Sequence, residues 1–287
     1  MSRWKLNNTD RQLIEMALQE DLGPNFQDVT TLCLFNNQPL PREAKIISKH
    51  KTAVIFCGTA IITAILDYFN TPFVIHSHFQ EGALIPPQSE ILVLQCQAST
   101  LLMAERTILN FLRRLCAIAT LTHAFVEKVK PTQLKILDTR KTTPGWRHLE
   151  KYAVQCGGGV NHRLGLYDTY MIKDTHVDLL GGMEQALKKL PCKESNTLPV
   201  IVEVRSLQEL QTVLNHGQNK VDRILLDNMS PELLAECVKL CKNIIPTEAS
   251  GNLSLENILA VAESGVNYAS IGMLTHSANS VDISMQI

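Results

Sequence analysis

The sequence lacks several features that would place the protein in a specialised class. It has no apolar run long enough for a membrane-spanning helix, and its N-terminal residues carry no apolar signal-peptide core. We therefore expect a cytoplasmic protein. An excess of one charge is also missing, because 27 basic residues are balanced by 28 acidic ones. A near-neutral chain does not suggest a broad nucleic-acid-binding surface.

Motifs for nucleotides, metals and covalent catalysis are scarce as well. The run Gly157–Gly159 matches neither a Walker motif nor a dinucleotide fingerprint. His76 and His78 lack a third zinc ligand, and no cluster completes a site around Cys237 and Cys241. The eight cysteines lie mostly in apolar segments, so we interpret them as reduced core thiols. No Ser–His or Cys–His pair suggests a protein nucleophile.

The 287 residues suffice for one large domain or two smaller ones. The first part mixes helical and strand-like runs without strict alternation, which favours an α+β unit with a helix layer on a small sheet. Asp28–Thr31 is predicted to be a polar turn, and the polar residues Glu105, Arg106, Asn110, Arg113 and Arg114 suggest a solvated helix face. The predicted helices span 9–21, 59–69 and 99–122, and the predicted strands span 44–48, 53–57, 73–79 and 91–97.

From Leu134 onward, short apolar strands alternate with helices that have clear start signals. Ser206 begins a capping-box pattern, and Ser230 precedes a first-turn proline. Such repetition predicts a parallel sheet, either open or closed into a barrel. The predicted strands span 135–137, 170–172, 200–204, 223–226, 244–246 and 268–271.

Charged and small residues stand at the predicted carboxyl ends of these strands. In a barrel, such ends converge on one mouth, where catalytic groups gather. Between Lys135 and His176, seven basic residues accompany four acids. This concentration suggests a pocket for a small, highly anionic ligand. The strand-end groups are Asp138–Lys141, Lys173 with Asp174, Glu203, Asp227 with Asn228, Glu248–Gly251, and Gly272.

Six motifs, in order along the chain, resemble those of quinolinate phosphoribosyltransferase, the decarboxylating enzyme that makes nicotinate mononucleotide for NAD synthesis. The similarity covers nearly the whole chain, including the early segments 17–22 and 105–110. The motifs are Asp138-Thr-Arg-Lys-Thr-Thr-Pro-Gly, Asn161-His-Arg-Leu-Gly-Leu, Met171-Ile-Lys-Asp-Thr-His, Ile224-Leu-Leu-Asp-Asn, Glu248-Ala-Ser-Gly-Asn and Ile271-Gly-Met-Leu-Thr-His-Ser.

The resemblance implies a mixed α/β protein with two domains. Residues 1–112 would form an N-terminal open-faced α+β sandwich, and residues 113–273 an irregular, TIM-like α/β barrel. The tail 274–287 would pack back on the sandwich. The resemblance also implies a homodimer, or a higher oligomer built from it, whose active sites are completed by the partner's N-terminal domain.

Site residues follow from the same resemblance. Lys141, Glu203 and Asp227 would be catalytic, and the two acids would approach Mg²⁺ weakly or through water. Arg106 would come from the other subunit. Quinolinate and phosphoribosyl pyrophosphate would contact Arg106, Thr139, Arg140, Lys141, His162, Arg163, Lys173, Glu203 and Asp227, with phosphate loops at Ser250, Gly251, Asn252 and Gly272.

The loop 23–28 is longer than the family pattern, and Trp146 stands where an aliphatic residue is usual, which we expect to place it beside the pocket. Two alternatives remain open. One is a relative associated with molybdenum that acts on another pyridine or pyrimidine carboxylate; the joint presence of the arginines and lysines above argues against it. The other is a non-catalytic binder of anionic metabolites. Glu203 and Asp227 argue against this second reading, because an anion-binding pocket gains little from carboxylates.

Overall fold

The computed structural model describes residues 4–35, 38–192, 197–242 and 244–287. The chain forms two compact units. Unit 1 comprises residues 1–123, 142–158 and 275–287, and unit 2 comprises residues 124–141 and 159–274. The first unit thus extends to His123 at its first break, and residues 142–158 are grouped with it. In the described part of the chain, no helix has the length and apolar character needed to cross a membrane.

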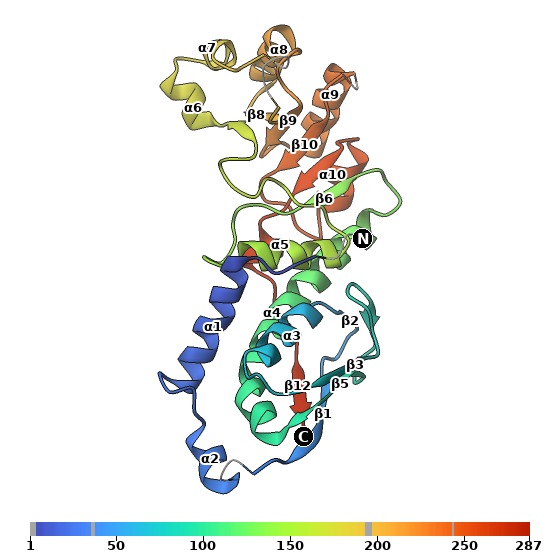
Figure 1. The fold of residues 1–287 in the computed structure, drawn as a ribbon. Helices are drawn as coiled ribbons and strands as arrows, with labels where there is room; N and C mark the ends of the chain where they lie inside the picture. Colours follow the sequence, from blue (N-terminus) through green and yellow to red (C-terminus); the bar gives the residue numbers. More distant parts are fainter. Residues whose placement is uncertain (1–3, 36–37, 193–196, 243) are drawn as a thin grey trace. The chain divides into compact units, whose positions relative to one another are not determined.

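Unit 1 is built on a four-stranded antiparallel sheet in the order β12-β1-β5-β3 (Figure 1). Its last strand comes from the chain's end, where β12 pairs with β1. A two-stranded sheet joins β2 to β4. The strands are β1 (Pro41–Ser48), β2 (Val54–Ile55), β3 (Val74–Ser77), β4 (Leu84–Ile85), β5 (Glu90–Gln97) and β12 (Ile283–Gln286); the helices are α1 (Asn8–Leu22), α2 (Val29–Phe35), α3 (Thr59–Asp67), α4 (Ala98–Val129, which continues into unit 2) and α5 (Arg147–Cys156).

The predicted polar turn at Asp28 is wrong, because α2 begins there. The Asp28 carboxylate accepts hydrogen bonds from Thr30 N and Thr31 Oγ1, which satisfies donors at the helix start. The hydrogen bond from Thr31 also lowers the pKa of Asp28. The polar residues therefore cap a helix.

The two residues that flank α5 fit closely against α4. Trp146, immediately before α5, stacks on Phe111 with ring centroids 4.6 Å apart. It therefore packs against a buried aromatic ring of α4. At the other end of α5, a Cβ on Gly157 would clash with Ala119 O and Thr122 Cβ. Close helix packing explains this glycine.

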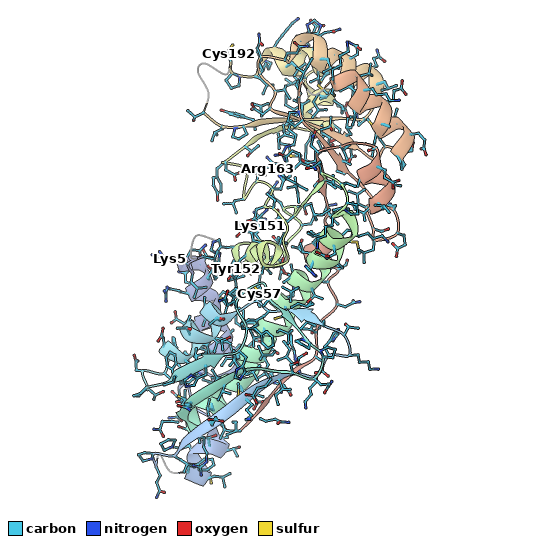
Figure 2. The ribbon with its side chains drawn as sticks, turned by 90° about the vertical axis from the view of Figure 1, so that its right-hand side faces the viewer. Lys5, Cys57, Lys151, Tyr152, Arg163 and Cys192 are labelled. Carbon is cyan, nitrogen blue, oxygen red and sulfur yellow. The ribbon has the colours of Figure 1, made fainter. Side chains whose placement is uncertain are left out.

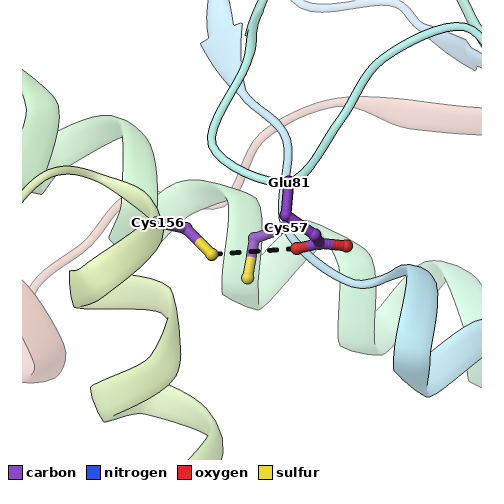
Figure 3. A group of neighbouring side chains, drawn as sticks. All are labelled: Cys57, Glu81 and Cys156. Carbon is purple, nitrogen blue, oxygen red and sulfur yellow. Dashed lines mark hydrogen bonds between the residues drawn. The ribbon is translucent and has the colours of Figure 1, made fainter. Parts of the chain in front are cut away.

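The eight cysteines are all free thiols, as expected, but they are not all in the core. Cys33 and Cys192 are exposed, and Cys156 is half-buried; Figure 2 labels Cys192. Cys156 lies close to Cys57 and Glu81 (Figure 3), and one potential ligand atom from each of the three falls within 4.8 Å of the others. The sequence showed no sign of this group, because its members are far apart along the chain.

Hydrogen bonds explain the arrangement around Glu81 without a metal. Its carboxylate accepts from Gly58 N at 3.0 Å and Thr59 N at 2.6 Å, at the start of α3. Tyr152 Oη donates at 3.0 Å and Cys156 Sγ at 3.7 Å. Glu81 thus supplies, from another segment, the cap that α3 lacks in its own sequence.

We expect Glu81→Ala to lower the free energy of unfolding of unit 1 by about 1–3 kcal/mol, because it leaves helix-start amides and a tyrosine hydroxyl without an acceptor. Urea-induced unfolding monitored by circular dichroism would measure the loss. Glu90→Ala is the matched control, since Glu90 pairs with Lys45 at the surface and should matter little. Equal stability of the two variants would contradict the capping role.

Unit 2 contains a six-stranded parallel sheet in the order β6-β11-β10-β9-β8-β7. Strands β7 to β11 follow chain order and β6 joins beyond β11, which is the order of a ring interrupted between β6 and β7. The strands are β6 (Lys135–Leu137), β7 (Tyr170–Ile172), β8 (Val200–Val204), β9 (Arg223–Asp227), β10 (Thr247–Ser250) and β11 (Tyr268–Ser270); the helices are α6 (Asp174–Leu179), α7 (Met183–Lys188), α8 (Leu207–His216), α9 (Pro231–Cys241), α10 (Ile258–Glu263) and α11 (Met273–His276).

The predicted helix starts in unit 2 are confirmed where side-chain caps were expected. Ser206 accepts from Glu209 N at 3.2 Å, and Ser230 accepts from Leu233 N at 3.3 Å. The one strand placed wrongly is the fifth, β10. It begins at Thr247, after Pro246, whereas the sequence suggested residues 244–246. This shift changes the position of Glu248 in the sheet.

Candidate active site

Asp138 holds together two of the predicted motifs. It follows β6 and is fully buried. Its carboxylate accepts from Asn161 Nδ2 at 2.6 Å and from His162 N at 2.8 Å. The loop that carries Arg140 is therefore tied to the loop that carries Arg163. The sequence indicated only that Asp138 ends a strand. Its role in joining the two loops was missed, although a buried carboxylate needs hydrogen-bond donors and Asn161 could supply one.

Arg140 and Arg163 lie on the two loops that Asp138 joins. Burial and the charge of Arg140 lower the pKa of Arg163, whereas Asp168 acts in the opposite direction. Arg163, labelled in Figure 2, is anchored by Nη1, which donates to Thr169 O at 3.3 Å. Arg140 Nε is buried and has no hydrogen-bond partner among the described residues. Two neighbouring guanidinium groups with a buried donor to spare suit an anionic ligand.

His162 has only 7% of its side chain exposed. Its Nδ1 accepts a hydrogen bond from Arg163 N at 2.7 Å, and its Nε2 lies 3.2 Å from Glu248 Oε1. Both ring nitrogens therefore face protein groups. This geometry favours a supporting role for His162 beside the Arg163 loop.

We predicted that Glu248 lies at the carboxyl end of its strand, at the mouth of the sheet. Instead it lies inside β10 and is fully buried. The prediction failed because the strand begins later than expected. Glu248 Oε2 accepts from Arg223 Nη1 at 2.9 Å, and the Arg223 guanidinium lies 4.0 Å from the centre of the Tyr268 ring. Burial alone would raise the pKa of Glu248, but its polar contacts with His162, Arg223 and Ser270 bring it below its ordinary value. Arg223 was missed because nothing in its sequence context marked it.

Lys173 and Glu203 form an ion pair between the ends of two neighbouring strands. Lys173 Nζ lies 3.1 Å from Glu203 Oε2. Glu203 is buried in β8, while 43% of the Lys173 side chain is exposed at the end of β7. Lys173 can therefore face a ligand while it balances a buried carboxylate.

Asp227 ends β9 beside Ser250, its neighbour at the end of β10. Asp227 Oδ1 accepts from Ser250 Oγ at 2.6 Å, and Oδ2 accepts from Asn228 Nδ2 at 2.7 Å. Gly251 has a φ of +88°, and a Cβ there would collide with Asn228 Oδ1. Asn252 Nδ2 in turn donates to Asn228 Oδ1 at 3.2 Å. The structure thus brings together three predicted phosphate-loop residues and one predicted acid.

The remaining predicted residues lie in three other places. Lys141 N donates to Thr139 Oγ1 at 3.0 Å, which shapes the turn after β6. Gly272 follows β11 and precedes α11. Arg106 belongs to unit 1, where it is exposed on α4.

The predicted solvated face of α4 is only partly correct. Arg113 donates to Ile283 O at 2.8 Å, and Arg114 forms a 2.8 Å ion pair with the fully buried Glu150. These two arginines hold unit 1 together. Arg106 differs from them, because no described acid pairs with it.

A cavity of about 270 Å³ opens beside the Arg163 loop. Pro199, Asp222 and Arg223 contribute to it from the amino ends of β8 and β9. Lys173, Glu203 and Asp227 do not line it, so this cavity is separate from the strand ends that carry the predicted acids. Its lining residues are Asn161, His162, Arg163, Asp168, Thr169, Pro199, Ile201, Asp222 and Arg223.

Comparison with known proteins identifies the family. The family model for the quinolinate phosphoribosyl transferase N-terminal domain matches residues 28–116 of the sequence. The family model for the C-terminal domain matches residues 118–286. The chain belongs to the quinolinate phosphoribosyltransferase family. The resemblance of the six motifs is thereby confirmed, and so is the mixed α/β fold.

Individual relatives agree with this assignment. A probable nicotinate-nucleotide pyrophosphorylase (carboxylating) from Bacillus subtilis is 40% identical over 280 residues, which cover 96% of this chain and 93% of the relative. A mitochondrial decarboxylating quinolinate phosphoribosyltransferase from Nicotiana tabacum is 36% identical, covering 96% of this chain and 82% of the relative. The structure of the nicotinate-nucleotide pyrophosphorylase from Francisella tularensis superposes with a TM-score of 0.89 at 33% identity, covering 98% of each chain.

Proposed function

We propose that the protein transfers a phosphoribosyl group from phosphoribosyl pyrophosphate to quinolinate and releases CO₂ and pyrophosphate, forming nicotinate mononucleotide for NAD synthesis. The observation that carries this proposal is that Asp138 ties the loop of Arg140 to the loop of Arg163, with a buried Arg140 Nε that has no partner among the described residues. Two arginines on joined loops suit an anion with adjacent negative charges, and quinolinate has two neighbouring carboxylates. Family membership supports the same substrate class.

Quinolinate binding would rest on Arg140, Lys141, Arg163 and Lys173. Arginine forks suit carboxylates, and lysine adds point charges around them. Thr139 would shape the turn that presents Lys141. His162 would act through Arg163, because its own ring nitrogens face protein groups.

Phosphoribosyl pyrophosphate would occupy the ends of β8 to β11. Ser250, Gly251, Asn252 and Gly272 would offer hydroxyl, amide and backbone donors to its 5′-phosphate. Mg²⁺ bound with this substrate would neutralise the pyrophosphate, and the oxygen ligands of Glu203 and Asp227, on adjacent strands, fit such an ion. Asp227 would also face the ribose hydroxyls.

Charge stabilisation and positioning would perform the catalysis. The bond from C1 of the ribose to pyrophosphate breaks with its electron pair on the leaving group. Glu203 and Asp227 would stabilise the oxocarbenium-like carbon electrostatically. The pyridine nitrogen then donates its lone pair to C1. Finally CO₂ leaves the ring, its bonding electrons are stabilised by the quaternary nitrogen, and a proton takes its place on the ring carbon.

The assembly would be a homodimer in which each subunit completes the other's site. Arg106 supports this part of the proposal, because it is exposed on α4 while its neighbours Arg113 and Arg114 have partners within unit 1. In a two-fold dimer, whatever one subunit lends its partner is returned by symmetry.

One assay tests the proposed reaction directly. Quinolinate labelled at its 2-carboxylate should release labelled CO₂ only when both phosphoribosyl pyrophosphate and Mg²⁺ are present. Loss of CO₂ without phosphoribosyl pyrophosphate would indicate a simple decarboxylase. If both ligands bind and no CO₂ or nucleotide forms, the protein is a non-catalytic binder and the proposal fails.

Substitutions should separate the two halves of the site. Arg163→Ala and Lys141→Ala should each weaken quinolinate binding by about 1.5–3 kcal/mol, because each removes a charged hydrogen-bond donor. Asp227→Ala should weaken binding of phosphoribosyl pyrophosphate with Mg²⁺ and leave quinolinate binding largely intact. Isothermal titration calorimetry with each ligand measures both effects. Similar losses for both ligands in all three variants would mean that these roles are misassigned.

A further inference from the structure

A series of polar side chains leads from β11 to the Arg163 loop. It starts at the half-buried Tyr268, whose ring lies 4.0 Å from the Arg223 guanidinium. Arg223 Nη1 donates to Glu248 Oε2 at 2.9 Å. Glu248 Oε1 is buried and forms no hydrogen bond to a described residue, and it lies 3.2 Å from His162 Nε2. Arg223, Glu248 and Tyr268 sit on the adjacent strands β9, β10 and β11, which therefore position the carboxylate that faces His162.

The hydrogen bonds of His162 determine where its proton lies. Nδ1 accepts from the Arg163 backbone amide at 2.7 Å, so Nδ1 carries no proton. An imidazole must then carry its proton on Nε2, which faces the Glu248 carboxylate. A doubly protonated ring would direct Nδ1–H at the Arg163 N–H, and two donors cannot share that distance.

We propose that Glu248 is a positioning residue that holds the His162 ring with its Nε2–H toward the carboxylate and its Nδ1 toward the Arg163 amide. Arg223 fixes the Glu248 carboxylate for this purpose. His162 Nδ1 then receives the Arg163 amide, and this sets the backbone from which the Arg163 guanidinium reaches the substrate. The role differs from that of a cation in the quinolinate pocket, and it rests on the proposed function only where it concerns the substrate.

Replacing Glu248 by glutamine tests the arrangement at its centre. A glutamine has one acceptor and one donor where the carboxylate has two acceptors. If its oxygen faces Arg223, its NH₂ faces His162 Nε2, and the histidine proton must move to Nδ1, against the Arg163 amide. If the amide is reversed, NH₂ faces Arg223 instead. Either orientation leaves two donors opposed, so the position of Arg163 should change.

The kinetic test compares Glu248→Gln with Glu209→Gln. The control also removes one negative charge from an ion pair, which Glu209 forms with Arg205. The Arg205 side chain is 42% exposed, so this pair is closer to solvent than the pair of Glu248 with Arg223. We expect the KM for quinolinate to rise about 10-fold to 100-fold in Glu248→Gln, with the KM for phosphoribosyl pyrophosphate changed less than about two-fold. The control should alter neither. An unchanged KM for quinolinate, or an equal rise in both, would overturn the proposal.

A spectroscopic test measures the tautomer of His162 directly in the wild-type protein, so it does not depend on whether a Glu248 variant folds. In the ¹⁵N-labelled wild-type protein, under the conditions of the activity assay, His162 should show an unprotonated Nδ1 and a protonated Nε2, with its signal identified by its loss in His162→Gln. Protonation of Nδ1 under those conditions would overturn the proposal even if catalysis is confirmed. If instead the tautomer is as stated but quinolinate is not turned over, the proposed function fails and the tautomer assignment stands.

Discussion

Arg106→Ala and Lys141→Ala homodimers should each lose about 100-fold or more of their activity, and mixing them should restore it. Each lesion removes one cation from every site of its own dimer. If Arg106 serves the partner's pocket, a mixed dimer has one site with both lesions and one with neither. Random exchange makes half the dimers mixed, so about a quarter of wild-type activity should return. Labelled CO₂ release after subunit exchange would measure the recovery.

The matched control for this mixing experiment is a pair of lesions in the same pocket. Arg163→Ala mixed with Lys141→Ala should recover activity only if the two residues come from different subunits. Both lie in unit 2, on loops linked through Asp138 and Asn161. Each site of a mixed dimer then keeps one lesion, and no recovery is expected. Absence of recovery for Arg106 as well, after exchange is verified by mass, would mean that Arg106 serves its own subunit.

Nicotinate should be a very poor substrate, with kcat/KM at least about 1,000-fold below that of quinolinate. Nicotinate lacks the 2-carboxylate, so cations assembled for two carboxylates would remain incompletely paired. Arg140 Nε is already buried without a partner among the described residues, and leaving such groups unpaired after substrate binding is unfavourable. Nucleotide formation from each acid, followed by liquid chromatography, would give the ratio.

The ratio of kcat/KM for quinolinate to kcat/KM for nicotinate should decrease when Arg163 is replaced. Arg163→Ala removes part of the charge that distinguishes the two acids, so quinolinate should lose more than nicotinate. Glu209→Gln again provides a control outside the pocket and should leave the ratio unchanged. Comparable rates for both acids in the wild-type protein would contradict the assignment of the arginine pair to the second carboxylate.

Local sequence was a reliable guide where local interactions decide the structure. Strands β6, β7 and β8 have the predicted bounds, because each is a short apolar run between polar segments. The caps at Ser206 and Ser230 were also predicted, since a cap depends on residues within a few positions. Family membership was readable from the six motifs, whose order no local rule would produce by chance.

Predictions failed where strand register or distant partners decide the outcome. Glu248 was placed at a strand end, but β10 begins at Thr247, where it pairs with Ile224 of β9. That register buries Glu248 beside Arg223, which is 25 residues away. Similarly, Glu81 caps α3 from another loop, and Asp138 receives donors from a segment more than 20 residues later.

The α/β alternation, the caps at Ser206 and Ser230, the family and the set of charged residues available for an anionic substrate could all be read from the sequence. Tertiary structure decided which of those charges remain for the ligand. It assigned Arg113 and Arg114 to unit 1, Lys173 to Glu203, and the His162 ring to Glu248 and the Arg163 amide. The reason is physical: a buried charge needs a partner, and only the folded chain brings together partners that lie far apart in sequence.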